Sequence, residues 1–159
     1  CDDVDECVGY ECDSYCFDQD YTGYNCWDIF VLLEFIESNQ SLAGLDPLEI
    51  GYQVWDDNGR LTFLTLYNMY LTTIPESIGN LSSLERLSLG SNQLTSFPES
   101  IGNLSSLETL FLDDNQLTSV PESICDLPDD CYIYVDSNNL CEEYHYDCLS
   151  YLGNQDCQE

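Results

Sequence analysis

The stretch PESIGNLSSLE occurs twice without a change, at Pro75–Glu85 and at Pro98–Glu108, and the two copies start 23 residues apart. A third copy starts at Pro121 and diverges at its fifth residue, where Cys125 stands in place of glycine. A fixed period of about 20–29 residues is typical of a solenoid, in which every repeat adds one structural row. The sequence therefore predicts a stacked array that ends near Cys125.

Aligning the chain on itself at this period places residues of one kind in columns. The apolar columns are Leu64, Leu87, Leu110 and Ile133; Leu66, Leu89, Leu112 and Val135; and Leu71, Leu94, Leu117 and Leu140. A further column holds Met69, Asn92, Asn115 and Asn138. We expect about four rows, each with a short strand whose alternate side chains enter a shared core. The asparagine amides are predicted to satisfy buried backbone groups that water does not reach.

These rows resemble the leucine-rich repeat family. The segments LERLSLGSNQLTSFP and LETLFLDDNQLTSVP fit its motif at every consensus position, and the likeness covers about residues 61–140. The resemblance implies an α/β solenoid with short parallel strands. A helix is predicted over Trp27–Ser38, starting at Asn25 or Asp28. This helix, Trp55 and GRLTFLTL at Gly59–Leu66 resemble the N-terminal caps of plant and bacterial members.

Cysteines gather at both ends of the array, so we divide the chain into a Cys-rich N-terminal region with the capping helix (1–60), the repeats (61–140) and a Cys-rich C-terminal cap (141–159). Ten cysteines indicate disulfides formed in an oxidising compartment. The expected half-cystines are Cys1, Cys7, Cys12, Cys16 and Cys26 before the array, and Cys125, Cys131, Cys141, Cys148 and Cys157 at its end.

The spacing of the last cysteines restricts their pairing. If the segment from Cys141 to Gly153 is helical, Cys141 and Cys148 lie about 10.5 Å apart along the axis, which is too far for a disulfide. We therefore expect each to pair with Cys125, Cys131 or Cys157. Because each end holds an odd number, one cysteine per end is expected to be left over. A terminus that wraps around the array, or a lipid on Cys1 as in bacterial lipoproteins, are the alternatives.

The composition is strongly acidic, with 31 Asp and Glu against two basic residues and a formal net charge of -29. That charge repels nucleic acid and anionic lipid, so neither is an expected partner. No apolar run is long enough to span a bilayer. The sequence lacks a phosphate loop, a dinucleotide motif and a nucleophile elbow, and its single histidine is His145. A secreted or cell-surface protein without enzymatic activity is therefore expected.

A calcium site is a hypothesis for the N-terminal carboxylates. Asp18 and Asp20 are spaced like the first half of a calcium-binding loop, but Ile29 stands where that loop needs a glutamate. A standard loop is therefore not expected, and freely solvated carboxylates are the alternative. No other cofactor is indicated.

The exposed strand positions are expected to form a concave face rich in aromatic residues, a composition that usually marks binding. Its predicted ligand-binding residues are Phe63, Tyr67, Arg86, Phe111, Asp113, Tyr132, Tyr134 and Asp136. We expect this face to bind a protein or a glycan. The alternative is a structural subunit that assembles head-to-tail into an extracellular filament or surface layer. N-x-S sequons at Asn39, Asn80 and Asn103 are candidate glycosylation sites.

Overall fold

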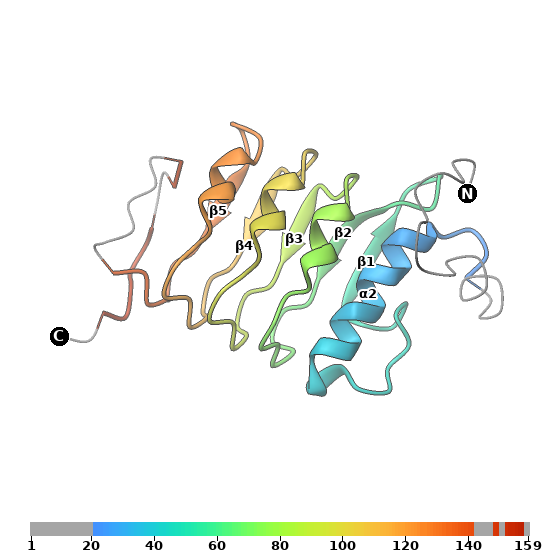
Figure 1. The fold of residues 1–159 in the computed structure, drawn as a ribbon, viewed down its shortest axis with the longest axis horizontal. Coiled ribbons are helices and arrows are strands. Elements are labelled where there is room, and N and C mark those ends of the chain that lie inside the picture. Colours follow the sequence, from blue (N-terminus) through green and yellow to red (C-terminus); the bar gives the residue numbers. More distant parts are fainter. Residues whose placement is uncertain (1–20, 142–147, 150–151, 158–159) are drawn as a thin grey trace.

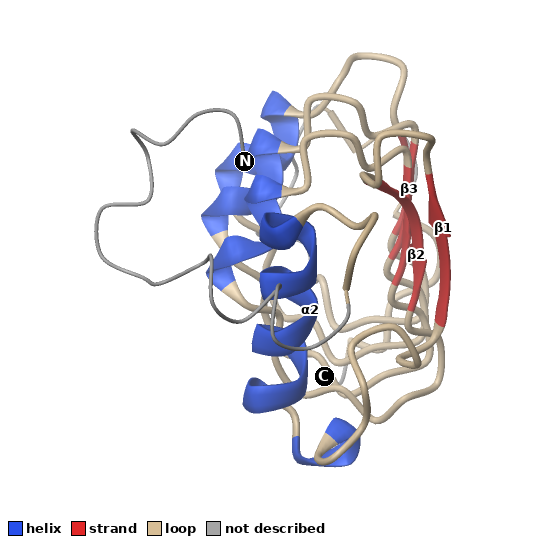
Figure 2. Ribbon diagram, turned by 90° about the vertical axis from the view of Figure 1, so that its right-hand side faces the viewer, coloured by secondary structure: helices blue, strands red, loops and turns tan. Residues whose placement is uncertain are grey.

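The protein folds into two layers, with helical elements on one side (Figure 1) and a sheet on the other (Figure 2). The computed structural model describes residues 21–141, 148–149 and 152–157. The sheet order is β1-β2-β3-β4-β5, with bounds Tyr52–Trp55, Leu61–Thr65, Arg86–Ser88, Thr109–Phe111 and Tyr132–Tyr134. The helical elements are α2 at Cys26–Ser38 and the 3-10 helices η1 at Gln40–Leu42, η2 at Glu76–Asn80, η3 at Glu99–Asn103 and η4 at Glu122–Asp126.

The repeated rows stack in the predicted register. Strands β2 to β5 pair in parallel, with Leu64 opposite Leu87, Leu87 opposite Leu110, and Leu110 opposite Ile133. The three leucines are fully buried. Parallel neighbours need a crossover connection, and here the 3-10 helices η2, η3 and η4 supply it. Ile133 is only partly buried, since no described strand pairs with the outer edge of β5.

Asparagine amides connect each row to the next, as the sequence predicted. Asn92 Oδ1 accepts the backbone N–H of Leu71 at 3.0 Å, and its Nδ2 donates to the carbonyl oxygens of Leu66 and Leu89 at 2.8 Å each. The same set of bonds recurs in the following rows at Asn115 and Asn138. One buried amide per row thus satisfies backbone groups that face the core.

The packing of the 3-10 turns explains why the third copy of the repeat breaks off. A Cβ on Gly79 would lie 2.5 Å from the carbonyl oxygen of Ser100, and Gly102 faces the oxygen of Ser123 even more closely. Glycine is therefore required wherever another turn stacks outside. In the described residues no 3-10 turn follows η4. The equivalent position can therefore carry the side chain of Cys125.

Helix α2 closes the N-terminal end of the array. Asn25 Oδ1 accepts the N–H groups of Trp27 and Asp28, which confirms the predicted start of the helix. The carboxylate of Asp28 is fully buried and forms two bonds with Arg60, Nε to Oδ2 at 2.9 Å and Nη2 to Oδ1 at 3.1 Å. It also accepts the N–H of Leu61 at 2.8 Å. These bonds fasten the helix to the first residue of β2.

The strand β1 was not anticipated from the sequence. It pairs antiparallel with β2, with Tyr52 opposite Thr65, so the sheet holds one strand more than the repeats supply. Trp55 packs edge-on against Tyr24 with ring centroids 4.8 Å apart. A hairpin therefore covers the first repeat strand, where the leucine-rich pattern alone would leave an open sheet edge.

Two disulfides tie the C-terminal cap. Cys125 pairs with Cys148 and Cys141 pairs with Cys157, at Cα separations of 5.4 and 5.7 Å. Both pairings lie within the choices that the spacing allowed. The expectation that Cys131 is also a half-cystine differs from the structure, where its thiol is free. The reason is that the other four cysteines of this cap pair with one another, so the odd count leaves one over.

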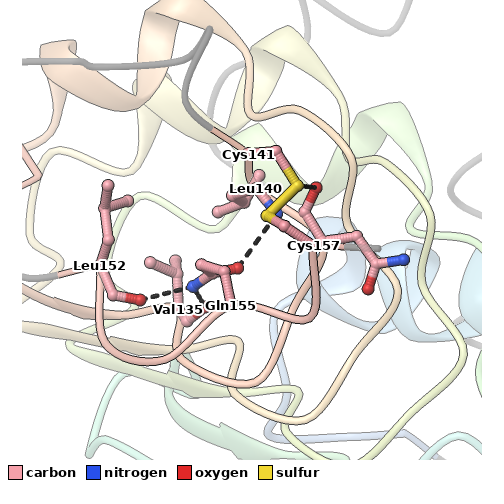
Figure 3. Close-up of a disulfide and its surroundings, with 7 residues drawn as sticks. Val135, Leu140, Cys141, Leu152, Gln155 and Cys157 are labelled. Carbon is pink, nitrogen blue, oxygen red and sulfur yellow. Dashed lines mark hydrogen bonds between the residues drawn. A yellow bond between two sulfur atoms is a disulfide. The ribbon is translucent and has the colours of Figure 1, made fainter. Parts of the chain in front are cut away.

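In the C-terminal cap, Gln155 forms backbone bonds (Figure 3) like those of the buried asparagines in the rows. Asn138 and Gln155 form a parallel bridge. Gln155 Oε1 accepts the N–H of Leu140 at 3.0 Å, while its Nε2 donates to the carbonyl oxygens of Val135, at 2.9 Å, and Leu152. The cap thereby adds the amide of a further row, and its described residues form an isolated bridge but no strand.

Several sequence-based expectations lie outside the described residues. They are the centre of the C-terminal helix and the side chains of Cys1, Cys7, Cys12, Cys16, Asp18, Asp20 and His145. The calcium hypothesis and the N-terminal disulfides therefore stay predictions, as do the three domain bounds.

Candidate binding face

One face of the sheet packs on the helical layer and the other is turned away from it, as Figure 2 shows. We call the second surface the concave face. The strand register orders its side chains into ladders that cross the strands. The first ladder is Tyr52, Thr65, Ser88, Phe111 and Tyr134, and the second is Val54, Phe63, Arg86, Thr109 and Tyr132. A third ladder, just past the strand ends, is Tyr67, Gly90, Asp113 and Asp136. All eight predicted ligand-binding residues belong to these ladders.

Aromatic side chains dominate the solvent-exposed part of this face. The exposed fractions are 69% for Tyr132, 54% for Tyr67 and 41% for Tyr134. The rings of Phe111 and Tyr134 stack with centroids 4.8 Å apart and planes 12° apart. That separation equals the strand spacing, so the parallel register itself brings the two rings together. The result is a firm apolar surface at the C-terminal half of the face.

A cation lies over the aromatic residue at the other half. The guanidinium of Arg86 on β3 sits 4.7 Å from the ring centroid of Phe63 on β2, within cation–π range. The register places these residues directly opposite each other. The face therefore holds one internal cation–aromatic pair beside one aromatic pair, Phe111 and Tyr134, that stacks on itself.

Carboxylates follow the stacked rings two residues later in the chain, just past the ends of β4 and β5. The side chain of Asp113 lies beside Gly90, where a Cβ would be 3.0 Å from its Oδ1. Partial burial, with smaller contributions from the charges of Asp136 and Asp114, raises the pKa of Asp113 above its usual value. These carboxylates repel one another, and neither arginine of the chain neutralises them, because Arg60 pairs with Asp28 and Arg86 lies over Phe63.

Tyr52 extends the face and was missed by the sequence analysis. It lies on β1 with 65% of its surface exposed and occupies the first ladder. A signal was present in Asp57-Asn58-Gly59, because Asn-Gly between two alternating segments favours a tight hairpin. Gly59 indeed lies at a positive φ of 72° and donates its N–H to the carbonyl of Asp56.

In the described residues no group of three His, Cys, Asp or Glu side chains is placed to hold a metal ion. The acidic corner of the concave face, formed by Asp113, Asp114 and Asp136, is therefore not arranged as a chelating site. No described helix has both the length and the apolarity needed to cross a bilayer.

A cavity of about 380 Å³ lies at the C-terminal end of the array. Its lining includes Ile124, Ile133 and Cys131, together with the Cys125–Cys148 disulfide. Burial, and secondarily the charge of Asp130, raises the pKa of the Cys131 thiol to about 11. At neutral pH this thiol is protonated and is a poor nucleophile. The thiol is therefore not activated as a catalytic nucleophile.

Comparisons with known proteins agree with the row architecture. Residues 59–117 match the family model described as "Leucine rich repeat". A chain of the crystal structure of PEPR1-AtPEP1 aligns with a TM-score of 0.54 and 21% identity over 70% of this chain, which shows the fold alone. The Leptospira interrogans LRR protein LIC12759 aligns with a TM-score of 0.47 and 40% identity over 50% of this chain.

The chain spans only 18% and 20% of the lengths of those two structures, respectively. A search of curated proteins found no significant match. The family-model match and the stacked rows together support a leucine-rich repeat protein.

Proposed function

We propose that this chain is a non-enzymatic extracellular interaction module that binds a protein or a glycan through its concave face. The observation that carries the proposal is the set of exposed aromatic side chains on one sheet surface, led by Tyr52, Tyr132 and Tyr134. A sheet face that only meets water gains nothing from such rings, whereas Tyr is enriched among the residues that dominate binding energy. Leucine-rich repeats serve as protein-interaction modules, in keeping with this role.

The two disulfides support the extracellular part of the proposal. Cys125–Cys148 and Cys141–Cys157 close the C-terminal cap, and such bonds persist mainly in oxidising compartments. The net charge of -29 suits a surface in contact with salt-rich surroundings, where screening shortens the range of self-repulsion.

Binding to peptide and glycan arrays tests the proposal when three forms of the chain are compared. The wild type is set against Tyr132→Ser/Tyr134→Ser, which removes two rings from the concave face. Tyr70→Ser is the control, because Tyr70 is 64% exposed but lies outside the three ladders. Ligands of the wild type should lose about 30-fold in affinity to the double variant, as expected of binding hot spots, and keep their affinity for the control. Equal losses in both variants, or no ligand at all, would contradict the proposal.

Head-to-tail assembly is the second candidate, favoured by the C-terminal end of the sheet. Strand β5 has no described partner on its outer edge, and Cys131, whose thiol is free, lines the cavity nearby. Non-reducing gels and negative-stain electron microscopy of the wild type and Cys131→Ala separate the two functions. Fibres or reductant-sensitive ladders that vanish in the variant would favour assembly, whereas a monomer in every condition rules it out.

A further inference from the structure

We infer that the segment bound by the concave face is extended and cationic, carrying Lys or Arg side chains. This inference rests on the proposed function and adds the chemistry of the partner. The partner's cation would lie against the rings of Phe111 and Tyr134 and beside the carboxylates of Asp113 and Asp136. Three steps support it: the supply of cations in the chain, the carboxylates of the face and the span of the ladders.

The first step is the supply of cations. The chain contains two basic residues besides its single histidine, and both are already engaged. Arg60 pairs with the buried Asp28 at the N-terminal end, and Arg86 lies over Phe63. At one half of the face, a guanidinium already lies against an aromatic ring. At the other half, neither Arg60 nor Arg86 lies over Phe111 and Tyr134, because both are engaged elsewhere.

The second step is the position of the carboxylates. Asp113 and Asp136 stand in the third ladder, two residues past Phe111 and Tyr134, and Asp114 donates its N–H to the carbonyl of Asp136. Partial burial and the neighbouring charges raise the pKa of Asp113, so the ionised form is under strain there. A cation between these groups would relieve that strain while contacting the rings.

The wider field acts in the same direction. A net charge of -29 attracts cationic partners over about a Debye length and raises their rate of encounter. Neutral sugars would contact the same rings but would gain nothing from this field. The charge pattern therefore favours a basic protein segment over a glycan.

The third step is the span of the ladders. From β2 to β5 the face crosses three strand spacings, about 14 Å in all, which an extended segment of about five residues covers. Thr65 and Ser88, with short side chains, lie between Tyr52 and Phe111 in the first ladder, and Gly90 lies between Tyr67 and Asp113 in the third. A segment lying across the strands can therefore place one side chain over this low centre and a cation at the acidic corner.

Fluorescence anisotropy with three labelled peptides tests the inference. The probes are GKGKGKG and its counterparts with Gln or Glu in place of Lys. The test variant is Asp113→Asn/Asp136→Asn, and the matched control is Asp57→Asn/Asp126→Asn, which removes the same charge at exposed positions outside the three ladders. The Lys probe should bind the wild type and the control within twofold of each other. It should bind the test variant about 5-fold more weakly, in line with two exposed ion pairs.

The aromatic contribution has its own variant. Phe111→Leu/Tyr134→Leu keeps the charge and should weaken the Lys probe about 3-fold through the lost cation–π contact. Circular dichroism of each variant confirms that the sheet is retained.

The remaining outcomes separate this inference from the proposed function. Equal weakening by the test and control variants would reduce the binding to general charge attraction and overturn the inference. Binding of the Gln probe, or of a neutral oligosaccharide, that depends on Phe111 and Tyr134 but not on Asp113 would also overturn it. That second result would leave the concave face as a binding surface. Absence of any binding by the Lys probe overturns the cationic partner, while the array experiment above still decides the proposed function.

Discussion

The two ends of the array face the same physical problem and solve it with different chemistry. Each end exposes apolar rungs and unpaired backbone groups. At the N-terminal end, α2, the hairpin strand β1 and the buried Asp28–Arg60 pair cover them. At the C-terminal end, two disulfides and the amide of Gln155 do so. A solenoid end therefore needs closed apolar surface and satisfied backbone, and several kinds of residue can provide both.

The first prediction breaks the N-terminal end and has the largest expected effect. Arg60→Met leaves the carboxylate of Asp28 buried without a counter-charge, which should cost about 3–5 kcal/mol of unfolding free energy. Urea denaturation followed by circular dichroism measures the loss. Asp28→Leu/Arg60→Met removes both charges and should recover most of it. A single variant as stable as the wild type would show that the ion pair does not hold the cap.

The second prediction breaks the C-terminal end. Cys125→Ala/Cys148→Ala and Cys141→Ala/Cys157→Ala remove bonds that close loops with sequence separations of 23 and 16. Loop-closure entropy gives each about 3 kcal/mol, so the two losses should be similar. Thermal unfolding of the oxidised chains measures these losses, and reductant should destabilise a chain that lacks both bonds less than it destabilises the wild type. Cys131→Ala is the control and should leave the response to reductant unchanged.

The third prediction compares the side-chain amide of Asn115, in an interior row, with that of Gln155, which makes similar bonds in the C-terminal cap. Asn115→Leu leaves the Leu94 N–H and buried carbonyls without partners and should cost about 3 kcal/mol. Gln155→Leu strips similar bonds from a partly exposed site, and about 1 kcal/mol is expected. Hydrogen exchange at the Leu94 and Leu140 amides reports each loss locally. A larger loss at Gln155 would show that the end rung carries more than the interior one.

The smallest expected effect concerns the acidic corner of the concave face. Because the folded pKa of Asp113 is raised above 3.8, the native state holds this proton more tightly than the unfolded chain. Stability from this group is therefore present below pH 3.8 and falls as the pH rises through the raised value. Asp113→Asn should gain less than about 0.5 kcal/mol at pH 7, because solvent screens the site, and nothing at low pH. Unfolding at both pH values, against Asp57→Asn for the charge change, measures the difference.

The repeat made the interior of the fold predictable, whereas the ends required the structure. Leu87 and Leu110 follow from periodicity alone, because every interior row has the same neighbours. Met69 replaces asparagine in the first row. The neighbouring strand there is β1, which runs antiparallel, whereas each asparagine bonds the loop that follows a parallel neighbour. The burial of Asp28 was not predictable, because its partner Arg60 lies 32 residues away and no local pattern joins the two.

The candidate site was predictable where it lies on the repeats. The eight predicted residues share the concave face because strand alternation and the 23-residue register determine their direction. Pairings that cross between elements escaped prediction, as Tyr52 on β1 and the contact of Arg86 with Phe63 show. The structure also revises the expectation for the sequon at Asn39. Asn39 is 1% exposed and its amide donates to the carbonyls of Phe35 and Thr73, so a glycan cannot be attached there in the folded chain.

The glycines of the 3-10 turns, Gly79 and Gly102, determine how many rows can stack. Gly79 and Gly102 occupy equivalent positions, each against the serine of the next turn, and the amide bonds of Asn92 and Asn115 reach no further than the adjoining row. Duplicating residues 98–120 would therefore lengthen the sheet by one strand and leave both ends unchanged. The cysteine at position 125 acts as the stop signal, because a turn that bears a side chain admits no successor. The number of rows is therefore set by the number of turn glycines, here Gly79 and Gly102, that precede Cys125.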